Sequence, residues 1–264
     1  MALQTAVSAR LAAGLALTLL TAAAPASAQG KFPPESLRNL QALPEGTTVE
    51  QLVETMSGFT RALGVRCSYC HVGSAGQPLE TYDFAADTKQ AKKTARRMIR
   101  MVRVINTEHL ERLDERALPS VTVTCATCHR GVTQPRPLSD EVMAAYRKGG
   151  APAAAARYRE LREDHYGDGA YDFGDVPLTV VADTLQAAGD VPGALTLLQL
   201  NVELVPTSYF GYWQLAEMQD VAGQTQAAIA SLERAVALRP RPDLVERLAE
   251  LRKKAANPKP EEPR

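Results

Sequence analysis

The sequence predicts an all-α protein built from two domains. Several stretches repeat apolar residues at helical spacing, and no stretch of any length shows the two-residue alternation of a strand. The composition also changes near residue 138: all four cysteines lie before it, and the chain beyond it is rich in alanine and leucine. The proline-punctuated residues 131–138 (GVTQPRPL) therefore predict a linker between a domain of residues 29–138 and a domain of residues 139–255.

Residues 1–28 predict a cleaved secretory signal peptide. Arg10 precedes the apolar run LAAGLALTLL, and the sequence ASA at 26–28 supplies the small residues that signal peptidase accepts. The run is shorter than a membrane-spanning helix needs, which argues against the alternative of an uncleaved anchor. No later stretch is apolar enough to span a membrane, so we expect a periplasmic mature chain that begins near Gln29 and has no transmembrane segment.

The overall charge is close to zero. The chain has 30 basic and 30 acidic residues, and loss of Arg10 with the signal leaves a net charge of about −1. This balance argues against nucleic acid or a membrane surface as the general partner. At the other end, residues 256–264 predict a disordered tail.

All four cysteines fall in two copies of one motif, C-x-x-C-H. The copies are Cys67-Ser68-Tyr69-Cys70-His71 and Cys125-Ala126-Thr127-Cys128-His129. This pattern is the attachment site of a c-type haem: two thiols reach the two vinyl groups of one porphyrin, and the adjacent imidazole reaches the iron from the same side. The sequence therefore predicts two covalently bound haem c groups, with the cysteines as tethers and the two histidines as iron ligands.

Three other interpretations of the cysteines are weaker. Disulfides are common in exported proteins, but they leave the histidine after each pair unexplained. A C-x-x-C redox motif belongs to a βαβ context and would not be expected twice. A four-cysteine zinc site has its pairs separated by roughly 15–20 residues, whereas 54 residues lie between Cys70 and Cys125.

Methionines on two predicted helices are candidates for the sixth iron ligand. An electron carrier is expected to fill both axial positions of its iron, usually with methionine or histidine. Thr48, with Gln51 three residues on, predicts the start of a helix that ends at Gly64. Met56 lies in the apolar stripe of that helix, so it is either a ligand or an ordinary core residue.

The second predicted helix spans residues 88–113. Its apolar face contains Met98 near the centre, whereas Met101 lies about 80° away. The small Ala91 and Ala95 would let a flat macrocycle approach this face. Met98 is the favoured ligand of the second haem iron, Met101 is the alternative, and His109 comes after both.

The opposite side of the same helix is basic. It has five cationic residues: Lys89, Lys93, Arg96, Arg100 and Arg103. A surface for an acidic redox partner or for haem propionates is one interpretation, and a plain solvated face is the other.

Residues 34–138 resemble one half of the photosynthetic reaction-centre cytochrome c subunit and related diheme cytochromes. The resemblance depends on Met56 before CSYCH, on the run ARRMIRMVRVIN, and on VTCATCHRG. In that family most irons take a methionine from the helix that precedes the haem motif, which implies Met56 for the first iron and Met98 for the second. The reaction-centre subunit has four haems in two such halves, whereas this chain has one pair, and nothing in it points to a reaction centre.

The second domain resembles a tetratricopeptide repeat. At an offset of 34 residues the chain matches itself at Ala182/Ala216, Gly189/Gly223, Ala194/Ala228, Leu198/Leu232, Leu204/Leu238 and Pro206/Pro240. Two units are predicted at 175–208 and 209–242, with a degenerate helix pair at 139–163 before them. Residues 242–254 predict a capping helix, which a stacked array needs to cover its apolar end.

Together these features predict an exported diheme c-type cytochrome that transfers electrons and is not an enzyme. Its partners would be redox donor and acceptor proteins or a membrane electron-transfer complex. The repeats would dock a protein partner or only pack against the haem domain. Two alternatives stay open: a diheme enzyme such as a peroxidase, which needs an open sixth position on one iron, and an interaction protein whose haems sense redox state.

Overall fold

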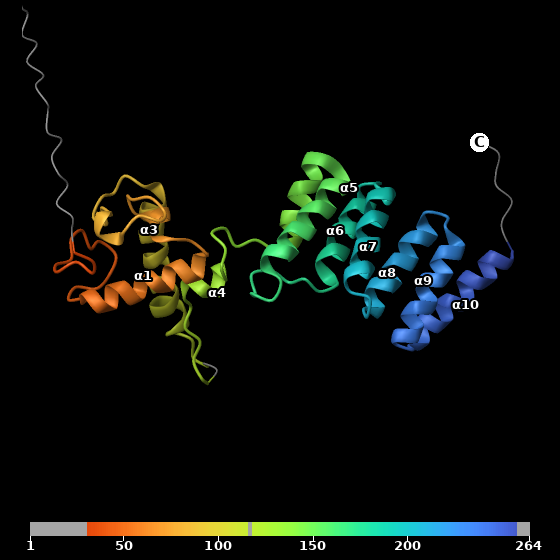
Figure 1. Ribbon diagram of the computed structural model, residues 1–264. Helices are drawn as coiled ribbons and strands as arrows, with labels where there is room; N and C mark the ends of the chain where they lie inside the picture. Colours follow the sequence, from red (N-terminus) through yellow and green to blue (C-terminus); the bar gives the residue numbers. More distant parts are fainter. Residues whose placement is uncertain (1–30, 116–117, 258–264) are drawn as a thin grey trace, which may run out of the picture.

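The computed structural model describes residues 31–115 and 118–257, and across them it is helical (Figure 1). Within these ranges β pairing is limited to one isolated bridge between Val72 and Asp83, so the all-α prediction is confirmed. None of the helices described combines the length and hydropathy needed to cross a membrane. The predicted signal peptide and the tail from residue 258 lie outside the described residues.

The N-terminal part of the chain consists of short helical elements joined by long loops. These elements are α1 (Val49–Leu63), α2 (Cys67–Cys70), η1 (Leu79–Thr81), α3 (Gln90–Val104), η2 (Ile105–Leu110) and α4 (Cys125–His129). Each C-x-x-C-H motif occupies one of the short helices, α2 or α4, and each follows a longer helix in the chain.

Helix α1 begins and ends where the sequence predicts. The Gln51 amide donates to the Thr48 hydroxyl, and the Gln51 side chain accepts from the Thr48 amide, which completes a capping box. At the other end Gly64 adopts φ 64°, the left-handed conformation that favours glycine.

The single helix predicted for residues 88–113 is wrong in its last part. Helix α3 ends at Val104, and η2 continues the chain as a π-helical turn in which the Glu111 amide donates to the Asn106 carbonyl at 2.9 Å. The Asn106 side chain explains this wider turn, since it donates to the Val123 carbonyl (2.8 Å) and accepts from the Val123 amide (2.9 Å). Asn106 therefore ties the end of this helical segment to the residues just before α4.

The C-terminal part is a row of antiparallel helices (Figure 1). They are α5 (Leu138–His165), α6 (Val176–Ala187), α7 (Val191–Leu204), α8 (Tyr209–Val221), α9 (Thr225–Leu238) and α10 (Pro242–Ala256). Helix α5 is broken by non-helical backbone at Gly149 and Gly150, so it forms the helix pair expected at 139–163. Helices α6–α7 and α8–α9 lie within the two predicted units, and α10 is the predicted last helix.

The two parts differ sharply in how they are packed. The C-terminal part has two buried apolar clusters, one of α5–α8 around residues such as Tyr158 and Leu198, and one of α8–α10 around Leu232. Among residues 31–115 and 118–137, the only buried apolar residues are Ala42 and Ala62. The N-terminal part therefore lacks the core that a domain of its size ordinarily builds from its own side chains.

Candidate haem sites

The first C-x-x-C-H motif opens onto a large cavity. Met56 of α1 and three residues of the motif, Cys67, Cys70 and His71, line it together. Its volume of about 880 Å³ is in the range of pockets that hold cofactors. The other walls come from residues 31–43, the loop after α2 and one side of α3. The structure thus brings the four residues predicted for the first haem to one cavity.

The ring of His71 is held in place by one hydrogen bond and one aromatic contact. Its Nδ1 lies 3.2 Å from the carbonyl oxygen of Phe84, and the two rings pack edge to face with centroids 5.0 Å apart. Because a carbonyl oxygen only accepts, Nδ1 is the donor, and Nε2 keeps its lone pair for a metal. Burial lowers the pKa of His71, and the Lys92 ammonium lowers it further, so the neutral ligand form is favoured.

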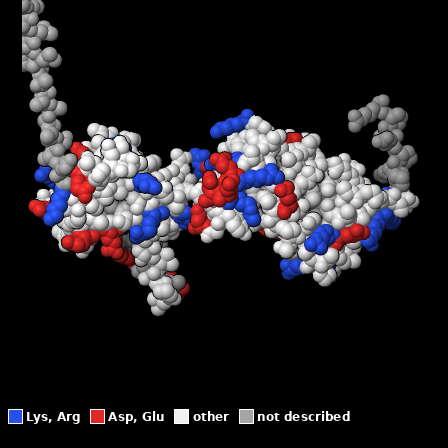
Figure 2. Space-filling view, in the orientation of Figure 1, with Lys and Arg blue, Asp and Glu red and all other residues white. Residues whose placement is uncertain are grey.

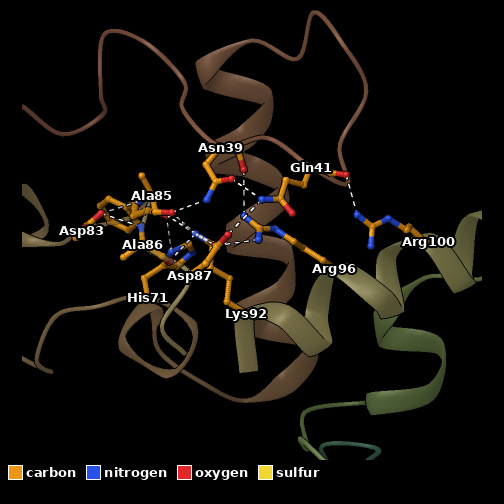
Figure 3. Close-up of polar contacts among 11 residues, drawn as sticks. Asn39, Gln41, His71, Asp83, Ala85, Ala86, Asp87, Lys92, Arg96 and Arg100 are labelled. Carbon is orange, nitrogen blue, oxygen red and sulfur yellow. Dashed lines mark hydrogen bonds and ion pairs between the residues drawn. The ribbon is translucent and has the colours of Figure 1, made fainter. Parts of the chain in front are cut away.

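The loop after α2 is fixed from α3 by Lys92 (Figure 3). The Lys92 ammonium donates to three successive carbonyls, those of Phe84 (2.9 Å), Ala85 (3.0 Å) and Ala86 (2.8 Å). The carboxylate of Asp87 lies 3.1 Å from the same nitrogen and 2.8 Å from Nη1 of Arg96. Hydrogen bonds from Arg96 and its neighbours hold the pKa of Asp87 well below its ordinary value, so this group stays charged.

Most of the basic side of α3 contacts loops of the N-terminal part, while Lys93, Arg100 and Arg103 are also exposed. Arg96, Arg100 and Arg103 donate to main-chain carbonyls of the N-terminal segment, those of Asn39, Gln41 and Ala42 respectively. Lys89 donates to the carbonyl of Ser68. A guanidinium with several donors suits exposed loop carbonyls, and these contacts press residues 39–42 onto the first cavity. These contacts involve four of the five predicted cations, and the fifth, Lys93, is exposed as a solvated face predicts.

The second motif repeats the arrangement of the first histidine. Nδ1 of His129 lies 2.9 Å from the carbonyl oxygen of Val132, so Nε2 of this ring is also left as the acceptor. Helix α4 is anchored to α1, because the Gly131 amide donates to the Ala62 carbonyl at 2.9 Å. Neither carbonyl partner, Phe84 or Val132, could be found from the sequence, since any residue supplies a main-chain oxygen.

The structure does not gather the remaining candidates around the second motif in one cavity. Cys125 lines a cavity of about 640 Å³ with residues of α1, α4 and Asp168, and neither Met98 nor Met101 is part of that lining. Both methionines are exposed on α3, Met98 at 40% and Met101 at 48%, and Cys128 is exposed as well.

One secondary expectation for this site also changes. Ala95, expected beside the second haem, lines the first cavity. His165, the fourth histidine, lies at the end of α5 with its Nδ1 2.8 Å from Asp168.

The four cysteines lie in two separate short helices and form no disulfide with one another. Burial raises the pKa of Cys70 and of Cys125, which favours the protonated thiol at neutral pH. Within residues 31–115 and 118–257, no three or more His, Cys, Asp or Glu side chains form a metal-binding group. The donor set of each motif, two thiols and one oriented imidazole beside an apolar surface, fits a covalently attached haem.

A helical domain with this donor set defines a c-type cytochrome. Residues 4–160 match the family described as photosynthetic reaction centre cytochrome C subunit. The match covers more than half of the chain, and the protein belongs to this family, whose cytochromes carry covalently bound haem c in electron transfer. It extends beyond the resemblance seen at residues 34–138 and includes most of α5.

Comparison with other proteins adds little for the C-terminal part. No curated protein matches the chain. Among solved structures, the chain is similar to one described as the first TPR of Spaghetti (RPAP3) bound to HSP90 peptide SRMEEVD, at 16% identity and a TM-score of 0.33. That match covers 46% of this chain and 91% of the other. A likeness at this level does not establish a shared fold.

Proposed function

We propose that this protein is an exported diheme c-type cytochrome that carries electrons between partner proteins in the periplasm. The observation that supports it best is the hydrogen bonding of the two motif histidines, His71 and His129. Nδ1 of each ring donates a hydrogen bond to a loop carbonyl, which leaves Nε2 available to bind iron. A structural histidine has no need of this arrangement at two sites that also present two thiols each.

The first haem is assigned to Cys67 and Cys70 as tethers, with His71 and Met56 on its iron. These four residues line one cavity, and the surrounding N-terminal part has almost no apolar core of its own. A porphyrin would supply the missing apolar contacts. When bound, haem supplies a one-electron couple between ferrous and ferric iron, and a methionine ligand raises its potential. His71 and Met56 would hold the iron of this haem, and Cys67 and Cys70 would tether its porphyrin.

The second haem is assigned to Cys125 and Cys128, with His129 and a methionine of α3 on its iron. Met98 is the first choice and Met101 the alternative. On helix α3, the apolar side chains of Met98, Met101 and Val104 are exposed, each at 40% or more. Exposed apolar side chains in such a group indicate a binding surface, and a haem tethered at α4 would cover it.

The C-terminal helices are assigned to partner docking, as a tetratricopeptide-like array. Paired helices with a repeat of 34 residues support this role. The partners would be a redox donor and an acceptor, one of them at a membrane complex or held by the repeats. Figure 2 shows acidic and basic side chains interspersed on the face in view, which agrees with protein partners rather than nucleic acid.

A spectroscopic redox titration of protein matured in a periplasm with haem-attachment machinery tests this function. We expect two reversible one-electron steps, low-spin spectra and a methionine-to-ferric-iron band. Absence of haem would refute the proposal. A high-spin component, or carbon monoxide binding readily to one reduced haem, would favour the diheme enzyme instead.

The methionine assignments are tested by three matched substitutions, Met56→Leu, Met98→Leu and Met101→Leu. Leucine keeps the volume and removes the sulfur, so each variant isolates ligation from packing. We expect Met56→Leu and only one of the two α3 variants to reduce the methionine-to-iron band and lower one potential. A full band in all three variants would contradict methionine ligation.

A further inference from the structure

Lys92 is the only charged residue that is buried within residues 31–115 and 118–257, at 8% exposure. A charge is costly to bury unless polar partners surround it. The three donors of the ammonium are taken by the carbonyls of Phe84, Ala85 and Ala86, and the carboxylate of Asp87 lies at 3.1 Å. The fold therefore keeps a fully bonded cation at a fixed place inside the domain.

This cation is linked to the first motif through one atom. The carbonyl oxygen of Phe84 accepts from Lys92 Nζ at 2.9 Å and from His71 Nδ1 at 3.2 Å. Lys92 and His71 also line the same cavity. A substitution of Lys92 therefore has two effects. It alters the hydrogen bond of the His71 imidazole through the shared carbonyl, and it changes the charge at the cavity wall.

We propose that Lys92 is a positioning residue that raises the reduction potential of the haem held by His71. The inference rests on the proposed function. Reduction removes one positive charge from the iron, so a fixed cation nearby favours the reduced state. The shared carbonyl acts in the same direction: an oxygen already bonded to an ammonium accepts more weakly from His71, which makes the imidazole a weaker electron donor to iron.

The ion-pair group of Lys92 has more cations than anions. Asp87 is shared between Lys92 and Arg96, whose Nη1 lies 2.8 Å away, so two cations surround one carboxylate. Asp83, a second carboxylate of the cavity wall, accepts from the Ala85 and Ala86 amides at 3.0 and 2.9 Å and keeps its charge, but the wall also has the cations Lys31, Arg38 and Arg66 against Glu35 and Glu80. The Lys92–Arg96–Asp87 group therefore has one net positive charge beside the first motif and has no counterpart in the contacts of His129.

Two substitutions, one that removes a positive charge and one that removes a negative charge, test the proposal in the intact, haem-loaded protein. Lys92→Gln removes the cation but keeps a donor for the carbonyls, and Asp87→Asn removes the anion. Lys93→Gln, at an exposed position next in the chain, is the matched control. The redox step that belongs to the first haem is identified as the one lowered by Met56→His, and the other step serves as an internal reference.

We expect Lys92→Gln to lower the first step by at least a tenfold change in its equilibrium constant, which is about 59 mV for one electron. Asp87→Asn should raise the same step, while Lys93→Gln and the second step stay unchanged. A merely structural role would shift both variants downward or convert the first haem to high spin, and either result would overturn the inference. Two haem steps with no shift would overturn it too, whereas missing haem would overturn the proposed function itself.

Discussion

The chain just after α1 packs so closely on the chain just after α4 that there is no room for a side chain at Gly64. Replacing Gly64 tests whether this close packing stabilises the contact between the two helices. Gly64 has φ 64°, and a Cβ on it would lie 2.1 Å from the carbonyl oxygen of Gly131. The Gly131 amide at the same contact donates to the Ala62 carbonyl at 2.9 Å. We expect Gly64→Ala to push α4 away from α1.

The magnitude has two parts. An L-residue in the left-handed region costs about 1–2 kcal/mol. The 2.1 Å approach is to main-chain atoms, which cannot rotate away, so the contact must open and the Gly131–Ala62 hydrogen bond is lost, at about 0.5–1.5 kcal/mol. Together we expect about 1.5–3.5 kcal/mol less stability for the N-terminal part.

Urea unfolding of the haem-loaded protein, followed by haem absorbance, measures this loss apart from the C-terminal helices. Gly76→Ala is the control, since Gly76 has φ 86° and a Cβ there would meet nothing within 4 Å. It should show the conformational cost alone, about 1–2 kcal/mol. If Gly64→Ala is no more destabilising than Gly76→Ala, the close approach of Gly131 has no energetic role.

Two further changes probe contacts elsewhere in the chain. Asn106→Leu leaves the amide and the carbonyl of Val123 without their partner, so we expect about 1–3 kcal/mol less stability in urea unfolding and a changed absorbance of the haem at the second motif. Thr107→Ala, at an exposed neighbouring position, is the control and should behave as wild type. Equal effects of the two substitutions would contradict the role of Asn106. Asp190 caps α7, and hydrogen bonds from Tyr146 and the Gly193 amide lower its pKa. Its charge therefore stabilises the fold above the unfolded pKa of about 3.9, and this contribution is lost as pH falls through the lower folded value. The stability difference between wild type and Asp190→Asn should be full at pH 6 and shrink below pH 4, and a difference independent of pH would refute it.

Local sequence signals predicted those features that depend on a few neighbouring residues. The capping box at Thr48 and Gln51 and the terminal Gly64 placed α1 correctly. The break at Gly149 and Gly150, and the 34-residue repeat, placed the helices of the C-terminal part. Each of these patterns acts over one turn, one helix or one pair of neighbouring helices, where local residue spacing determines the backbone conformation.

No local sequence pattern predicted the contacts that main-chain oxygens make. The loop carbonyls that orient His71 and His129 come from Phe84 and Val132, whose side chains give no hint of the role. The π turn after Val104 depends on Asn106 meeting Val123, seventeen residues further on, and helical periodicity contains no trace of that pairing. These features follow from the path of the loops, which residue patterns do not fix.

The same distinction explains why the contacts of the basic side of α3 were not predicted. Five cations, Lys89, Lys93, Arg96, Arg100 and Arg103, have a spacing that ordinarily marks a face in water. Lys93 is exposed as that spacing predicts, but the other four, and Lys92 beside them, donate to main-chain carbonyls and attach residues 39–42, 68 and 84–86 to one helix. In a part of the chain that buries almost no apolar side chains of its own, these charged donors replace the core as the means of holding loops in place. Met98, Met101 and Val104 are exposed on another side of α3, where the second haem is proposed, so one helix would serve two sites with different faces.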